Sequence, residues 1–377
     1  MARADSLSVF QFVFRVSVLT SPTQLPRLKI RFGTGWDTCN YHCEYCVTDQ
    51  PIGDNDDSPT TLPVLSRLRS AAANPSKVLR KVVSVANRLP VLPGKETPTI
   101  GWDEGKYLRI IDRCAELPYS LDVRIGVGGE TFINKTVVEG ARRLSNHANT
   151  AAVNLISNLS FSFKQYEKIF QGFDLSRIAM VCSFHPTEIK DIDRWIETAA
   201  EINQIVDLAI VLVAWPPLMP TLIENKERLE QAGLEVFVQA FHGWHEQKKF
   251  PESYSDADRD LLASVFYSKH DYAHMVDLIQ PGDCYAGVDY VYVDINGDVW
   301  RCGTYKMPLG NLFKGFDLMS RPAPCPGTEC WCDTENLNTV AFRKQYELNS
   351  LNQHKYRARA NTMGELAIDQ SATSDSN

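Results

Sequence analysis

Three cysteines near the amino end of the chain, Cys39, Cys43 and Cys46, are spaced C-x3-C-x2-C. Thiolates are soft ligands that select iron–sulfur clusters, zinc or Cu(I). A 4Fe–4S cluster has four irons and normally takes four thiolates. A local triplet therefore predicts a cluster with one open iron, which can bind a small molecule and pass it an electron.

The segment Cys39–Cys46 resembles the cluster loop of radical S-adenosylmethionine (radical SAM) enzymes, in which an aromatic residue, here Tyr45, usually precedes the third cysteine. The resemblance implies that a 4Fe–4S cluster on the three cysteines binds the methionine part of S-adenosylmethionine. It also implies reductive cleavage to a 5′-deoxyadenosyl radical, which abstracts a substrate hydrogen atom. The alternative is a zinc knuckle or a chance group of buried cysteines, although zinc motifs more often pair C-x2-C with a second ligand pair.

A second motif, Gly128-Gly129-Glu130, follows an apolar segment over 121–127 that is typical of a strand. Two glycines let a backbone approach a ligand closely, and a carboxylate can accept hydrogen bonds from an ammonium group. The resemblance implies that Gly128, Gly129 and Glu130 bind the methionine amino group of the cofactor. By the same resemblance, Ser157 and Asn158 are expected near the ribose or the methionine carboxylate.

The chain between these motifs and residue 250 alternates apolar strand patterns with helical patterns. Strands are expected over 28–32, 121–127, 152–157, 178–183, 208–213 and 236–240, and helices over 103–117, 135–147, 164–170, 191–202 and 223–232. Near-continuous Val/Ile/Leu strands between helices predict an α/β fold with a parallel sheet covered on both faces. The resemblance implies the partial (β/α)6 TIM-like barrel of the family, with the carboxyl ends of the strands facing the cofactor. His185 and His242 follow two of these strands and are substrate-side candidates.

Five of the ten cysteines lie near the carboxyl end: Cys284, Cys302, Cys325, Cys330 and Cys332. A helical pattern over 254–278 precedes them, and a hairpin over 290–301 with an Asn-Gly turn lies among them. This section resembles the SPASM and twitch auxiliary-cluster domains of radical SAM enzymes, with fewer cysteines than a full SPASM domain. The resemblance implies a second 4Fe–4S cluster with one spare thiol. Cys284 and Cys302 are the firmest ligands, and a structural zinc site is the competing interpretation.

The expected organisation is an N-terminal arm over 1–27, a barrel over 28–250, a cysteine-rich hairpin and helix domain over 251–350 and a polar, disordered tail over 351–377. An insertion over 49–98 interrupts the barrel. Between residues 60 and 95 it carries seven basic residues and no acidic one. This run is either a solvated helix face or an anion-attracting flap over the active site.

The 377 residues carry 39 Lys and Arg against 46 Asp and Glu, a net charge of −7 that argues against nucleic-acid binding. No apolar run is long enough to span a bilayer, and no export signal is evident. Ten cysteines in such a chain indicate metal ligation in a reducing compartment, so a cytoplasmic protein is expected.

The function that these motifs favour is a radical SAM enzyme of oxidoreductase type, which modifies a substrate C–H bond with redox help from the auxiliary cluster. The electron donor would be a flavodoxin or ferredoxin. Two substrate classes stay open: a ribosomally made peptide, or a small molecule such as a sugar or aminocyclitol. A non-catalytic iron–sulfur or zinc protein is the alternative of a different class.

Overall fold

The structure is a computed structural model that describes residues 25–36, 38–46, 102–126, 128–330 and 338–346. The expectations for most of the N-terminal arm, for the basic insertion, for Cys332 and for the polar tail lie outside the described residues.

Six parallel strands form the main part of one sheet. They are β1 (Arg27–Gly33), β2 (Ser120–Gly126), β3 (Thr150–Ser157), β4 (Ile178–Phe184), β5 (Asp207–Ala214) and β6 (Glu235–Ala240). Each strand pairs in parallel with the next one along the chain. The expected strands are therefore present, and the fold is a mixed α/β fold with a large parallel sheet.

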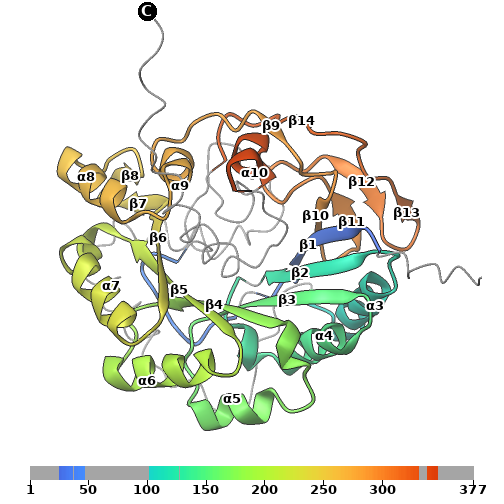
Figure 1. Ribbon diagram of the computed structural model, residues 1–377, viewed down its shortest axis with the longest axis horizontal. Coiled ribbons are helices and arrows are strands. Elements are labelled where there is room, and N and C mark those ends of the chain that lie inside the picture. Colours follow the sequence, from blue (N-terminus) through green and yellow to red (C-terminus); the bar gives the residue numbers. More distant parts are fainter. Residues whose placement is uncertain (1–24, 37, 47–101, 127, 331–337, 347–377) are drawn as a thin grey trace, which may run out of the picture.

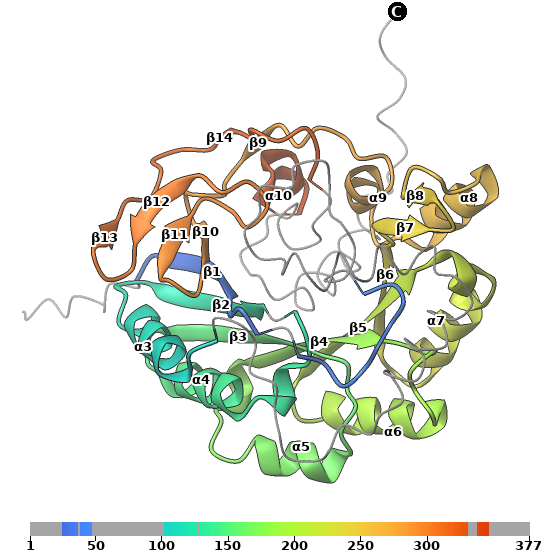
Figure 2. The ribbon, with the colours of Figure 1, turned by 180° about the vertical axis from the view of Figure 1, so that it is seen from behind.

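Helices connect these strands: α3 (Glu104–Ala115), α4 (Lys135–Asn146), α5 (Phe163–Ile169), α6 (Ile192–Asn203) and α7 (Leu222–Gln231), as expected. Short polar side chains begin several of them. Asp103, Asn134 and Asp191 each accept a hydrogen bond from a backbone N–H of the first turn, which satisfies a donor that the helix itself leaves unpaired. Figures 1 and 2 show the strands in an arc, with these five helices along its outer side.

The two faces of the sheet differ in chemistry because successive strand residues point to opposite faces. In β1, the apolar Leu28 and Phe32 are fully buried, and the Phe32 ring packs edge-on against Tyr107 of α3 with centroids 5.7 Å apart. The alternate positions of β1 to β3 carry buried polar residues, among them Lys29 and Asp122, which are paired in register. Both faces of β1 to β3 are thus largely buried, as expected for a covered parallel sheet, but the strands are not near-continuously apolar, because their inner face carries buried charged and polar side chains.

The carboxyl-terminal strands extend the same sheet. β10 (Tyr290–Val293) pairs in parallel with β1, and β11 (Asp298–Trp300), β12 (Pro308–Asn311) and β13 (Gly315–Phe316) follow in antiparallel order. The sheet order is β13-β12-β11-β10-β1-β2-β3-β4-β5-β6. The expected hairpin is present, with Gly297 at φ 77° in its turn. The hairpin joins the sheet through the pairing of β10 with β1, so the cysteine-rich segment belongs to the same sheet as the first strand.

The remaining elements are short. They are the 3-10 helices Thr131–Ile133, Leu175–Arg177 and Pro216–Thr221, the strands β7 (Gly243–His245), β8 (Lys248–Phe250), β9 (Asp283–Cys284) and β14 (Ala323–Pro324), and the helices α8 (Asp256–Val265), α9 (Lys269–Met275) and α10 (Val340–Tyr346). The continuous helical pattern expected over 254–278 is divided into α8 and α9, because Ser268 caps a new helix by accepting from the backbone of Asp271. Among the described residues, no helix has the length and apolar character to cross a membrane.

Candidate functional site

The cysteine loop begins where β1 ends. Gly33, the last residue of β1, lies against the Tyr292 side chain of β10, and a Cβ atom at Gly33 would lie 2.0 Å from the tyrosine hydroxyl. Beyond it, the Thr34 hydroxyl donates to the backbone carbonyl of Gly126 at 3.0 Å. The chain therefore leaves β1 in contact with the ends of both neighbouring strands, β10 and β2.

The Gly-Gly-Glu segment lies beside the cysteine loop, as the sequence predicts. The backbone N–H of Gly128 donates to the carbonyl of Trp36 at 2.7 Å, and that of Glu130 donates to the carbonyl of Thr38 at 3.0 Å. The Trp36 indole N–H returns a bond to the Glu130 carbonyl at 3.2 Å. Backbone hydrogen bonds thus join the Gly-Gly-Glu segment to the residues that lead into the cysteine motif, at the carboxyl-terminal ends of β1 and β2.

The Glu130 carboxylate is turned into the protein, where the residue is only 1% exposed. Its Oε1 accepts from the Phe132 backbone and the Ser157 hydroxyl, both at 3.0 Å, and its Oε2 accepts from the Asn158 backbone at 2.6 Å. Burial raises the pKa of this carboxyl to about 7, although the hydrogen bonds oppose the shift. Glu130 therefore holds the end of β3 against the Gly-Gly-Glu loop, and its binding of a methionine ammonium group stays a prediction.

Ser157 and Asn158, expected together at the cofactor, face different partners. Ser157 is buried, and its hydroxyl lies 3.1 Å from the Tyr166 hydroxyl as well as contacting Glu130. The Asn158 side-chain Nδ2 donates to Cys39 Sγ at 3.6 Å and to Asn40 Oδ1 at 2.9 Å. The Asn158 side chain therefore contacts the cysteine loop directly, whereas the Ser157 hydroxyl contacts Glu130 and Tyr166.

The three cysteines of the loop are partly buried thiols. A turn joins two of them, because the Cys46 backbone N–H donates to the Cys43 carbonyl at 3.2 Å. Burial, and then the Glu188 carboxylate, raise the pKa of the Cys43 thiol to about 12. Glu188 itself accepts a bond from the His42 backbone at 3.1 Å. The Cys43 thiol is therefore protonated at pH 7 in the metal-free protein, and a metal that binds it would replace this proton.

The Tyr45 ring, expected as the aromatic of the cluster motif, is buried in an aromatic group. Its centroid lies 5.0 Å from that of Trp215 and 5.6 Å from that of His185, and its hydroxyl lies 3.1 Å from His185 Nδ1. Burial lowers the pKa of His185 to about 4, so its imidazole is neutral at pH 7. The structure thus places His185 as a support for Tyr45, and its substrate role stays a prediction.

His242, the second substrate-side candidate, is hydrogen-bonded to the backbone of Met275, and burial lowers its pKa to about 4 as well. Its substrate role stays a prediction.

Two further residues, which the sequence analysis did not single out, contact the cysteine loop or the residues that support it. The Trp195 indole N–H donates to the Asn158 carbonyl at 3.1 Å, and Glu188 accepts from the loop backbone. Neither residue belongs to a motif, so no sequence signal marks it.

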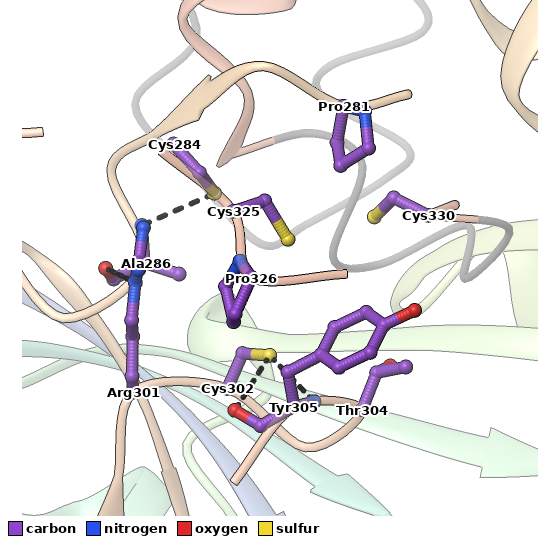
Figure 3. A pocket seen from close by; sticks show the side chains of 10 residues that line it. All are labelled: Pro281, Cys284, Ala286, Arg301, Cys302, Thr304, Tyr305, Cys325, Pro326 and Cys330. Atoms are coloured by element: carbon purple, nitrogen blue, oxygen red, sulfur yellow. Dashed lines mark hydrogen bonds between the residues drawn. The ribbon is translucent and has the colours of Figure 1, made fainter. Parts of the chain in front are cut away.

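A second group of cysteines surrounds a pocket near the carboxyl end (Figure 3). Cys284, Cys302, Cys325 and Cys330 all line it, together with Tyr305 and Arg301. Backbone N–H groups donate to two of the sulfurs, from Ala286 to Cys284 at 3.4 Å and from Tyr305 to Cys302 at 3.1 Å. Four of the five expected ligands are therefore brought together.

Within the described ranges, no three Cys, His, Asp or Glu side chains converge on one point closely enough to hold a single metal ion. The four carboxyl-terminal cysteines instead surround a space, and Figure 3 shows their sulfurs on different sides of it. Four thiols around one pocket fit a 4Fe–4S cluster, which takes one thiolate on each iron. The binding of a cluster by Cys39, Cys43 and Cys46 stays a prediction.

No protein-family model matches the sequence, and no curated protein matches it. Among solved structures, the chain is similar to BtrN in complex with AdoMet and 2-DOIA, with 12% identity, a TM-score of 0.35 and coverage of 78% of this chain and 81% of that one. It is also similar to selenomethionine BtrN in an open conformation, with 11% identity, a TM-score of 0.29 and coverage of 76% of each chain. These scores are too low to establish a shared fold, so function is argued from the residues of this chain.

Proposed function

We propose that this chain is a radical SAM enzyme of oxidoreductase type with a second, auxiliary cluster. The observation that carries the proposal is the contact of Gly128 and Glu130 with Trp36 and Thr38, the residues that lead directly into the Cys39–Cys46 motif. Backbone hydrogen bonds join the two loops where β1 and β2 end. A cluster loop beside a glycine pair supplies both soft ligands for iron and an open backbone for a ligand on that iron.

Cys39, Cys43 and Cys46 would hold a 4Fe–4S cluster that, when reduced and bound to S-adenosylmethionine, supplies a 5′-deoxyadenosyl radical able to take a hydrogen atom from an unactivated C–H bond. The protein contributes positioning. Asn158 donates to Cys39 Sγ, and the Tyr45 ring is fixed by Trp215 and His185. The glycine pair leaves the backbone accessible to the methionine part of the cofactor.

Cys284, Cys302, Cys325 and Cys330 would hold the auxiliary 4Fe–4S cluster, with Cys332 as the spare or exchanging thiol. A cluster with a thiolate on every iron has no open position, so its use is to carry electrons away from or toward the substrate. The backbone N–H groups on Cys284 and Cys302 would stabilise the ligated sulfurs. A structural zinc ion is the competing interpretation of these thiols, and it would require them to lie closer together than the described cysteines do.

The substrate belongs to one of two classes, a small hydroxylated molecule such as a sugar or aminocyclitol, or a ribosomally made peptide. A flavodoxin or ferredoxin in the cytoplasm would reduce the first cluster. Incubation of the reduced enzyme with both classes of substrate, followed by mass spectrometry of the products, separates the two.

The first test is chemical analysis of protein reconstituted without oxygen. About eight irons per chain are expected for two 4Fe–4S clusters, against about four if the auxiliary site holds zinc. The reduced protein with S-adenosylmethionine should release 5′-deoxyadenosine. If protein with a full complement of iron and sulfide releases no 5′-deoxyadenosine, the chain is instead a non-catalytic iron–sulfur protein.

A further inference from the structure

Arg301, the residue before Cys302, places a buried positive charge in the wall of the four-cysteine pocket. The residue is 3% exposed and lines the pocket together with the four cysteines (Figure 3). Its guanidinium also lowers the pKa of the Cys284 thiol, which places its charge within electrostatic reach of that sulfur, although burial raises that pKa overall.

The guanidinium bonds to neutral acceptors. Its Nε donates to the Ala286 carbonyl at 2.9 Å, its NH1 donates to the Pro324 carbonyl at 2.9 Å, and its NH2 donates to the Ala323 carbonyl at 2.6 Å. NH1 also lies 3.8 Å from the Met307 sulfur. Carbonyl oxygens satisfy the donors of a guanidinium but do not neutralise its charge.

A second arginine near Cys284 shows the usual arrangement. Arg343 forms a two-bond ion pair with the Asp289 carboxylate, at 2.6 and 2.8 Å. Arg301 has no such carboxylate among the described residues that bond it. Burying a charge without a counter-ion is strongly unfavourable. We therefore expect the anion that neutralises Arg301 to bind in the pocket.

The carbonyls that Arg301 bonds lie beside the other ligands. Ala286 is two residues after Cys284, and Pro324 is the residue before Cys325. One side chain therefore ties together the backbone segments that present Cys284, Cys325 and its own neighbour Cys302. The forked guanidinium group therefore keeps the backbone segments of Cys284, Cys302 and Cys325 in fixed positions relative to one another, with or without a bound cluster.

We propose that Arg301 is a positioning residue that also compensates the negative charge of the auxiliary cluster and thereby raises its reduction potential. This inference rests on the proposed function, because it requires the cluster. A cubane with four thiolate ligands is anionic and gains one further negative charge on reduction. A fixed cation beside it stabilises the reduced form more than the oxidised form, and net charge is one of the factors that set these potentials.

The test uses the full-length chain in which Cys39, Cys43 and Cys46 are all replaced by alanine, so that only the auxiliary cluster is present. Iron and sulfide content and the midpoint potential from an EPR-monitored redox titration are measured for this background and for Arg301→Gln, Arg301→Lys and Lys306→Gln added to it. Lys306 is exposed on the same β11–β12 connection and undergoes the same loss of charge, so it is the matched control.

Arg301→Gln should shift the midpoint potential to a clearly more negative value, whereas Arg301→Lys should stay closer to the background and Lys306→Gln should not move it. If Arg301→Gln binds no iron while Arg301→Lys binds the full amount, the charge is needed to hold the cluster, which also supports the inference. Loss of iron in both Arg301 variants, with full iron in Lys306→Gln, would support the positioning role, because neither glutamine nor lysine can form the three carbonyl bonds. Full iron binding by both Arg301 variants with the same potential as the background overturns the inference. A background protein that binds no iron would instead show that the proposed auxiliary cluster is wrong.

Discussion

The backbone N–H of Asn158 donates to Oε2 of Glu130 at 2.6 Å, and this bond fastens the end of β3 to the Gly-Gly-Glu loop. The side chain of the same asparagine donates to Cys39 Sγ. A continuous set of contacts therefore runs from the loop after β2, through the end of β3, to the cysteine loop after β1. The site is held by buried hydrogen bonds as well as by the order of its strands.

Replacement of Glu130 by alanine should destabilise the fold. Three buried donors, the Ser157 hydroxyl and the backbones of Phe132 and Asn158, would lose their common acceptor. We expect a loss of about 3 kcal/mol in the free energy of unfolding, the upper end of the range for a buried polar group left unpaired. Urea unfolding of the metal-free protein measures it. Glu197→Ala, which breaks only an exposed ion pair with Arg194, should change stability by less than about 1 kcal/mol.

Glu130 also predicts a pH dependence. Its pKa is raised from 4.5 to about 7, so between these values the folded chain binds more protons than the unfolded chain. The contribution of this group to the free energy of unfolding therefore falls as pH rises through this window, by about 3 kcal/mol. The glutamine of Glu130→Gln does not titrate. The difference in stability between the wild type and this variant should change accordingly from pH 4.5 to 7, and parallel pH profiles would contradict the assignment.

Much of the framework of the site follows from local sequence patterns. The six strands, the helices between them and the hairpin around Gly297 are where the apolar periodicity and the turn residues predict them. Parallel neighbouring strands have their carboxyl ends on the same side of the sheet, so the loops that follow them lie close together. For this reason the order of strands and motifs along the chain is enough to predict that Cys39–Cys46, Gly128-Gly129-Glu130 and Asn158 lie near one another.

Other features depend on which segments meet, and no local pattern carries that information. The hairpin pattern pairs β10 with β11 but does not say that β10 also pairs with β1. The partners of the Glu130 carboxylate come from another strand, so its inward orientation could not be predicted. Arg301 belongs to no recognised motif. The break between α8 and α9 did have a signal, because Ser268 is followed three residues later by Asp271, a capping pattern.

Acid should destabilise the fold through three histidines, the partly buried His185 and His242 and the fully buried His274. Burial lowers the pKa of each from 6.5 to about 4, so the unfolded chain binds more protons than the folded chain between these values. Their stabilising contribution is complete above about pH 6.5 and is lost as pH falls toward 4. In this window they oppose Glu130 and outnumber it, so unfolding free energy should rise with pH. His274→Gln should flatten the profile measured by urea unfolding, and an unchanged slope in this variant would contradict the assignment.

The link between Asn158 and the cysteine loop predicts a local change in mobility. Asn158→Ala removes the donor to Cys39 Sγ and Asn40 Oδ1. Loss of about 1 kcal/mol of local hydrogen bonding should speed amide hydrogen exchange in the peptide spanning 39–46 by about five-fold in the metal-free protein. Asn146→Ala removes exposed bonds to the Arg142 and Gly172 carbonyls and should leave that peptide unaffected. Equal exchange in the two variants would show that the Asn158 side chain does not hold the loop.

Substitutions in the two groups of cysteines should affect release of 5′-deoxyadenosine and formation of product differently. Cys43→Ala removes one of the three proposed ligands of the first cluster and should abolish release of 5′-deoxyadenosine. Cys302 lies in the other pocket, against the Tyr305 backbone. Cys302→Ala should therefore retain release of 5′-deoxyadenosine while product formation stops, because the cofactor site is intact but the electron carrier is not. Cys114→Ala is the control, since this thiol is buried in the core and has no proposed ligand role. Liquid chromatography with mass spectrometry of both 5′-deoxyadenosine and product measures the ratio, and an equal loss of both in Cys43→Ala and Cys302→Ala would show that the two cysteine groups do not have separate functions.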